Sequence, residues 1–275
     1  MSEALIQAPE FGRMLKDWRR HRRMSQLGLS SHSGISQRHI SFLETGRSNP
    51  SRGMVLALAD TLDVPLRERN ALLQSAGFAA GFSEQPLDSK AMSTFQSALQ
   101  ATLNHHEPFP AIVLDGRWNL VMANAGALRF FGLFVDMGQA LADIGSPMHF
   151  QIARLCLHDR GLKPFIVNWE DLAWSFLQRA RRALLHNPRD PHLPELIEEI
   201  VAHPEAPAHW QLPDWTSAPP PALIMTLRKD GRDYSLFTML AHFGAARNVT
   251  LEELSVESFY PADDETRQSL ETLAP

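Results

Sequence analysis

Three long polar side chains follow a serine in the segment 34–47, which reads GISQRHISFLETGR. Gln37, Arg38 and His39 carry amide, guanidinium and imidazole groups, and such groups form hydrogen bonds with the exposed edges of nucleic-acid bases or with phosphates. Ser36 is of a residue type that caps the start of a helix. We therefore expect a short helix that begins after Ser36 and carries these three side chains in its first turn.

The residues around this segment indicate five short helices between residues 11 and 77. In the first helix, apolar residues recur at helical spacing, which turns the basic residues between them away from the core. These apolar residues are Phe11, Met14, Leu15 and Trp18. The signals that start or end the other helices are Ser25, Gly34, Ser36, Ser51 and Pro65.

Positive charge is concentrated in the same part of the chain. Residues 13–52 hold nine Lys or Arg against Asp17 and Glu44, a balance of +7, although the whole chain carries −5. The remaining residues therefore sum to −12. A basic module on an acidic body indicates that one end meets a polyanion, whereas the alternative is that this run is only a solvated helix face.

Ser30, Gly34 and Ile40 have the spacing of a tight turn between two crossing helices. With the segments GISQRHISFLETGRSNPS (34–51) and LDVPLRERNALLQSAGF (62–78), the chain from 11 to 82 resembles the helix-turn-helix of the xenobiotic-response-element (Cro/CI-like) regulators. The resemblance implies binding to double-stranded DNA. The alternative is a degenerate five-helix domain that mediates protein contacts.

In that family the third helix enters the major groove with its N-terminus first, so Gln37, Arg38 and His39 are expected to read bases. The resemblance also implies that the start of the second helix and the loop after the third hold phosphates. The expected DNA contacts are Gln26, Ser36, Gln37, Arg38, His39, Ser41, Arg47 and Asn49. Because so short a reading helix covers few base pairs, we expect a homodimer on two half-sites.

A polar stretch at 83–91 is expected to be a linker between a domain at 1–82 and a second domain at 92–275. A helix from Met92 precedes two strands joined by Asp115-Gly116, and three further strands follow residue 222. Helices lie between, the best of them at 169–185 with Asn168 as its cap. The fold class is therefore α+β, with a five-stranded antiparallel sheet and inserted helices, as in PAS-like sensor domains.

The segments VLDGRWNLVMANAGA, LHDRGLKPFIVNWEDLA and FGAARNVTLEELSVESFYPAD resemble the MmyB-type ligand-binding domain. Asn248 departs from this family, in which an acidic residue is expected. The large flexible side chains between sheet and helix suit an apolar guest such as a fatty acid, and no other cofactor is expected. The expected ligand contacts are Arg154, His158, Asn168, Trp169, Trp174, Arg181, Phe237 and Met239.

Other functions are less well supported. Cys156 and His158 could suggest thiol chemistry, but two residues apart they lie on different faces of a helix, and HExxH and paired CxxC motifs are absent. We expect neither catalytic residues nor a metal site. A second domain that docks a protein and holds no ligand stays open as the alternative. Without an apolar run of about 18 residues, and with one cysteine, the chain is expected in the cytoplasm and not in a membrane.

Overall fold

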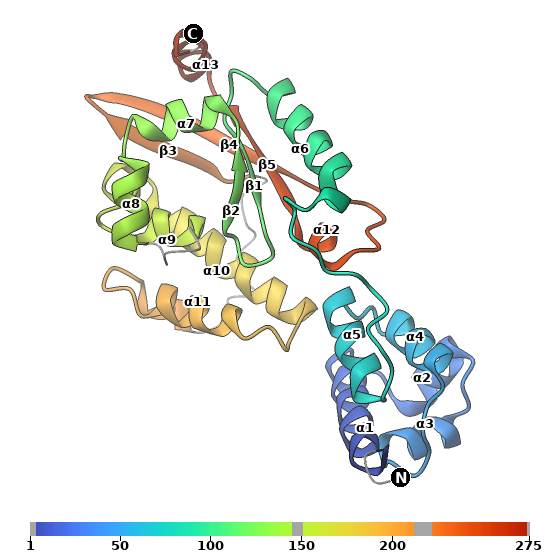
Figure 1. Cartoon of the computed structure of the whole chain (residues 1–275). Helices are drawn as coiled ribbons and strands as arrows, with labels where there is room; N and C mark the ends of the chain where they lie inside the picture. Colours follow the sequence, from blue (N-terminus) through green and yellow to red (C-terminus); the bar gives the residue numbers. More distant parts are fainter. Residues whose placement is uncertain (1–3, 145–150, 212–221, 274–275) are drawn as a thin grey trace. The chain divides into compact units, whose positions relative to one another are not determined.

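The computed structural model describes residues 4–144, 151–211 and 222–273. Packing divides the chain into two units, which are described separately (Figure 1). Unit 1 consists of Met1–Gln85 together with Ala245–Glu252, and unit 2 consists of Pro86–Gly244 together with Glu253–Pro275. The passage from unit 1 to unit 2 after Gln85 lies within the stretch expected to be a linker.

Unit 1 contains the five helices expected from the sequence. Their N-caps follow the sequence signals: the Ser25 hydroxyl accepts from Gly28 N, and the Ser36 hydroxyl accepts from His39 N. The apolar residues of the first helix are buried in a core shared by the helices of this unit, and the first helix packs against the third and fifth. The helices are α1 (Ala4–His21), α2 (Gln26–Ser33), α3 (Gln37–Glu44), α4 (Arg52–Thr61) and α5 (Leu66–Ser75).

Two glycines allow α3 to take its place. Gly34 follows α2 with φ of 71°, a left-handed conformation that residues with a β-carbon rarely adopt. Gly12 lies where α1 meets the end of α3, and a β-carbon there would come within 2.5 Å of the Leu43 carbonyl oxygen and 2.8 Å of the Glu44 carbonyl oxygen. The backbone of α3 therefore rests directly on α1.

The segment Ala245–Glu252 lies in unit 1, although it connects strands of the sheet in unit 2. The sequence had placed it in the second domain. Its helix α12 (Val249–Glu253) begins after Asn248, whose Oδ1 accepts from Leu251 N at 3.2 Å and whose Nδ2 donates to the Ser83 hydroxyl at 3.0 Å. The unexpected asparagine thus caps this helix and joins it to the chain before Gln85.

Unit 2 contains a five-stranded antiparallel sheet in the order β2-β1-β5-β4-β3, which confirms the expected fold class. Two strands precede the inserted helices and three follow them, as the hairpin signals predicted. The strands are β1 (Ala111–Leu114), β2 (Leu120–Ala123), β3 (Ile224–Lys229), β4 (Arg232–His242) and β5 (Ser255–Pro261).

Helices lie on both faces of the sheet (Figure 1). Along β1, Ile112 and Leu114 belong to the large core with α7, α9 and α10, whereas Ala111 and Val113 are buried on the other face, where α6 packs. The helices of unit 2 are α6 (Ser93–His105), α7 (Ala125–Gly132), α8 (Met137–Ile144), α9 (Ile152–Leu157), α10 (Trp169–His186), α11 (His192–Val201) and α13 (Asp264–Thr272), with short 3-10 turns η1 (Lys90–Met92), η2 (Lys163–Phe165) and η3 (Ala208–Gln211).

The start of α10 corrects one expectation. Asn168 precedes the helix as expected, but its side chain makes no capping hydrogen bond. Its Nδ2 donates to the Ile224 carbonyl at 2.7 Å, and its Oδ1 accepts from Thr226 N at 3.0 Å. Because both the oxygen and the nitrogen of its side-chain amide are used in this way, Asn168 ties the start of α10 to the edge strand β3.

Among the described residues, no helix is both long and apolar enough to cross a bilayer.

Candidate functional site

The first turn of α3 presents its polar side chains at the surface of unit 1. Ser36, Gln37 and Arg38 are exposed, and His39 and Ser41 are half-buried. The apolar residues of the same helix, Ile40 and Leu43, are fully buried. The helix is therefore fixed by one face and leaves the amide and guanidinium groups of the other free to meet a partner.

Further polar groups border this turn. The Arg38 guanidinium lies over the Phe42 ring, 5.3 Å from its centroid, so the aromatic ring supports the arginine one turn along the helix. In the loop after α3, Arg47 and Asn49 are exposed. The loop is held by the bond from Arg47 N to the Phe42 carbonyl at 2.8 Å. Arg47 can thus place a charge beside α3.

A nearly buried ion pair holds α1 against α3. Arg19 donates two hydrogen bonds to the Glu44 carboxylate, at 2.6 and 2.9 Å, and a third to the Met24 carbonyl. The hydrogen bond to Glu44 raises the pKa of Arg19. Gln26 Nε2 also donates to Glu44, at 2.9 Å. Arg19 is therefore a structural charge, and Gln26 is held in place at the start of α2.

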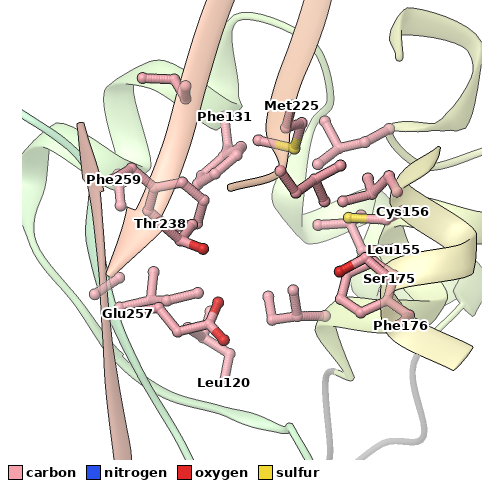
Figure 2. A pocket seen from close by; sticks show the side chains of 18 of the residues that line it. Leu120, Phe131, Leu155, Cys156, Ser175, Phe176, Met225, Thr238, Glu257 and Phe259 are labelled. Carbon is pink, nitrogen blue, oxygen red and sulfur yellow. The ribbon is translucent and has the colours of Figure 1, made fainter. Parts of the chain in front are cut away.

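Unit 2 contains a cavity of about 90 Å³ between the sheet and the helices α7 to α10 (Figure 2). A single water molecule needs roughly 10–15 Å³ of such space, so the cavity has room for several. Its wall is mainly aliphatic and aromatic, with Leu120, Phe131, Leu155, Phe176, Met225 and Phe259 among the lining residues. Such a surface favours an apolar molecule over water.

A charged pair enters this apolar wall from opposite sides. Glu257 on β5 points its carboxylate into the cavity (Figure 2), and Arg179 Nη1 on α10 donates to its Oε1 at 2.5 Å. The Arg179 guanidinium also lies over the Trp118 ring, 4.8 Å from its centroid. The hydroxyls of Ser175 and Thr238 line the same cavity. A small set of polar groups thus faces an otherwise apolar space.

Cys156 is buried and lines the cavity opposite β5. Burial, and secondly the negative charge of Glu257, raises the pKa of its thiol from 9.0 to about 12. The group is therefore a neutral thiol at physiological pH, in keeping with the small buried hydrophobe expected from the sequence. His158 is exposed, and its Nδ1 accepts from the backbone N of Arg160.

None of the eight residues expected to hold a ligand lines this cavity. On α10, Trp169 packs against His203 with ring centroids 4.5 Å apart, and Trp174 packs against Trp210 at 5.7 Å. Arg181 donates to the Trp210 carbonyl at 2.6 Å. These side chains lie on the face of α10 that packs against α11 and η3. A different face of α10 meets the sheet.

Three other residues expected to contact a ligand also lie outside the cavity. Phe237 stacks on Tyr260, and Met239 is 58% exposed, because strand alternation turns both away from the face that carries Leu236 and Thr238. Arg154 pairs with Glu199 and lines a separate polar pocket of about 160 Å³. Their role as ligand contacts stays a prediction, and the cavity brings other residues together.

Sequence reasoning missed Arg179, Glu257, Ser175 and Thr238. A signal for two of them was present. Glu257 is a charged residue inside the apolar strand segment at 255–261, two positions before Phe259 on the same face. Arg179 continues the spacing of Leu172 and Phe176 at helical intervals. A negative residue on the core-facing side of the strand and a positive residue on the core-facing side of the helix together predict a buried ion pair.

Within the described parts of the chain, no group of three or more His, Cys, Asp or Glu side chains could hold a metal ion.

Comparison with protein-family models identifies both parts of the chain. Residues 95–273 match the model of the MmyB-like transcription regulator ligand binding domain, and residues 10–72 match a helix-turn-helix domain. No curated protein matches the chain. One solved structure, "Structure of an RNA-binding Light-Oxygen-Voltage Receptor", shares 14% sequence identity with this chain and has a TM-score of 0.27. The match covers 98% of this chain and 64% of that one, which is less than two thirds of its length. Since the first model matches more than half of the sequence, the chain belongs to the MmyB-like transcription regulators, with a helix-turn-helix domain followed by a ligand-binding domain.

Proposed function

We propose that the protein binds operator DNA through the first turn of α3 and adjusts that binding when an apolar molecule occupies the cavity of unit 2. The observation that carries the proposal is the cavity itself, which lies between the sheet and α10, where the sequence led us to expect a ligand. The candidate ligands are fatty-acid-like molecules with a medium or long alkyl chain.

Energetics favour a chain over water in this space. Each methylene moved out of water contributes about 0.8 kcal/mol, so a chain of roughly ten carbons can outweigh the entropy lost on association. The lining side chains, such as Met225 and Phe131, are already buried or half-buried and lose little further freedom. The strand order β2-β1-β5-β4-β3, with helices inserted after the second strand, also supports the PAS-like assignment, in which such cavities hold ligands.

For DNA, we propose that Gln37, Arg38 and His39 face base edges, while Arg47 and Asn49 hold phosphates. The exposure of Gln37, Arg38, Arg47 and Asn49 supports this division. Gln26 uses one N–H on Glu44 and keeps a second for a phosphate. We further propose a homodimer on a pseudo-palindromic site in the cytoplasm, because one short helix reads only a few base pairs.

A titration with matched variants tests the proposal. The purified full chain is delipidated and titrated with medium- and long-chain fatty acids, alcohols and amides while its melting temperature and operator affinity are followed. We expect wild type to be stabilised and its DNA affinity to change. Ser175→Phe places a ring in the cavity and is expected to abolish both responses, whereas Arg182→Phe, on an exposed position of the same helix, is expected to keep them.

The alternative function, docking of a protein by unit 2 without a ligand, predicts the opposite result. In that case none of these molecules raises the melting temperature, and Ser175→Phe behaves as wild type in operator binding. Native mass spectrometry of the protein as isolated gives an independent reading, because a bound apolar molecule adds its mass to the chain.

A further inference from the structure

We propose that the ligand of the cavity carries a neutral hydrogen-bond donor, such as a hydroxyl or an amide N–H, and delivers it to the carboxylate of Glu257. The inference rests on the proposed function and names the polar end of the molecule. It selects alcohols and amides over free carboxylates.

Glu257 occupies the middle of β5, opposite Ile112 on β1 and Leu240 on β4. Its side chain is 6% exposed, and its carboxylate points into the cavity rather than toward bulk water (Figure 2). A carboxylate so placed needs hydrogen-bond partners, because burial removes those that water would supply. A partner for it must come from the chain or from whatever fills the cavity.

The chain supplies part of this need. Arg179 Nη1 donates to Oε1, and among the described residues no hydrogen bond reaches Oε2. An ionised carboxylate accepts about four hydrogen bonds. The remaining acceptor capacity faces a space whose other polar groups are the thiol of Cys156 and the hydroxyls of Ser175 and Thr238. A donor on the ligand would complete the set.

Charge balance then decides between kinds of polar end. The ionisable groups on the wall are Arg179 and Glu257, whose opposite charges cancel, and the neutral thiol of Cys156. A neutral donor keeps this balance. A ligand carboxylate would add a second negative charge beside Glu257 in an apolar enclosure, where like charges repel strongly. The Arg179 guanidinium already pairs with Glu257, so a ligand carboxylate would have to share one positive charge with it.

Trp118 holds the Arg179 guanidinium in place. The Arg179 guanidinium lies over the indole ring, so the arginine is held between the ring and Glu257. A planar cation stacked in this way and bound at its end has a fixed direction. Glu257 is therefore a positioned acceptor, and the ligand must match it.

The test compares three molecules with the same chain: dodecanol, dodecanamide and dodecanoate. Each is titrated into delipidated full-length protein at about pH 8, where the free acid is ionised, and binding is followed by calorimetry and melting temperature. We expect the alcohol and the amide to bind about tenfold or more tightly than the acid, the value of one hydrogen bond to a charged group. Glu257→Gln is expected to reverse this order in favour of the acid, since it removes the negative charge and leaves Arg179 without a counter-charge.

Glu199→Gln serves as the matched control, because Glu199 also pairs with an arginine, Arg154, but outside the cavity. It is expected to keep the wild-type order. If dodecanoate binds wild type more tightly than the other two, the inference is overturned while the proposed function stands, and this holds even if Glu257→Gln fails to fold. If none of the three binds, the proposed function itself is overturned and the inference falls with it.

Discussion

Glu252 caps a helix that begins 186 residues before it in the chain. Its Oε2 accepts a hydrogen bond of 2.7 Å from the backbone N of Leu66, the first residue of α5. Pro65, at the N-cap position of α5, offers no side-chain bond. Because the first amides of a helix lack partners within it, a carboxylate at this point satisfies one of them and meets the positive end of the helix dipole.

Replacing Glu252 by alanine is therefore expected to destabilise unit 1 by about 1 kcal/mol, the usual value of an N-cap. Glu252→Gln keeps an oxygen acceptor and is expected to lose less. Hydrogen exchange measured at the amides of Leu66 and its neighbours checks the prediction, with faster exchange in the alanine variant. Glu271→Ala, an exposed glutamate on α13, is the control. Unchanged exchange at Leu66 in Glu252→Ala would refute the capping role.

The close contact of α1 and α3 gives a second prediction. Gly12→Ala places a methyl group 2.5 Å from the Leu43 carbonyl oxygen, so α3 must move. We expect a loss of about 1–3 kcal/mol, typical of overpacking, and weaker operator binding. Gly53→Ala is the matched control, because a β-carbon there has no neighbour within 4 Å and α4 should gain about 0.5–1 kcal/mol in helix propensity. Thermal melts of the two variants that move in the same direction would contradict this account.

The division of DNA contacts predicts different effects for two arginines. Arg38→Ala is expected to cost roughly 1–3 kcal/mol on the operator and little on random DNA, because it removes a base contact. Arg47→Ala is expected to weaken both and to lower the slope of log affinity against log salt concentration by about one. Binding is measured by fluorescence anisotropy at several salt concentrations. An equal loss on both DNAs for Arg38→Ala would exclude a base-reading role.

Cys156 provides a chemical probe of the cavity, since it is the one cysteine of the chain. Burial raises the pKa of its thiol from 9.0 to about 12. The thiolate fraction near neutral pH therefore falls by about 1,000-fold relative to an exposed cysteine. We expect very slow reaction with Ellman's reagent in the folded protein and rapid reaction after unfolding in guanidinium. Native labelling at the rate of a free thiol would show that Cys156 is not enclosed.

The raised pKa of the Cys156 thiol also makes the stability of the fold depend on pH. The unfolded thiol ionises near pH 9 and the folded thiol only near pH 12, so this group does not affect unfolding below about pH 9 and lowers stability as pH rises between these values. Cys156→Ala is expected to remove that part of the alkaline decline in melting temperature. A decline that is identical in both proteins would contradict the prediction.

Local patterns predicted much of this fold. The spacing of Phe11 and Trp18 gave the buried face of α1, and Ser25 and Ser36 cap helices as expected, because a cap is decided within four residues. Asp115-Gly116 marked the first hairpin. These features depend on short stretches of chain whose physics can be evaluated without knowing the rest.

The residues that line the cavity could not be predicted from such local patterns. Strand β4 has large side chains at successive positions, so its alternation does not reveal that Thr238 and not Phe237 faces the cavity. On α10, aromatic residues lie on two faces, and the more aromatic of them meets α11. Asn168 could either cap α10 or tie it to β3, and only the tertiary structure decides.

The placement of Ala245–Glu252 bears on how such regulators diversify. The chain passes between its two units at Gln85, at Gly244 and at Glu252, so no single crossover in the gene exchanges one unit whole. A recombinant joined within residues 83–91 would combine α5 of one parent with the capping carboxylate of the other. Substitutions at positions 248–252 should consequently follow the ancestry of the helix-turn-helix rather than that of the sensor, and an alignment of relatives would reveal this as covariation between Leu66, Ser83 and the loop before β5.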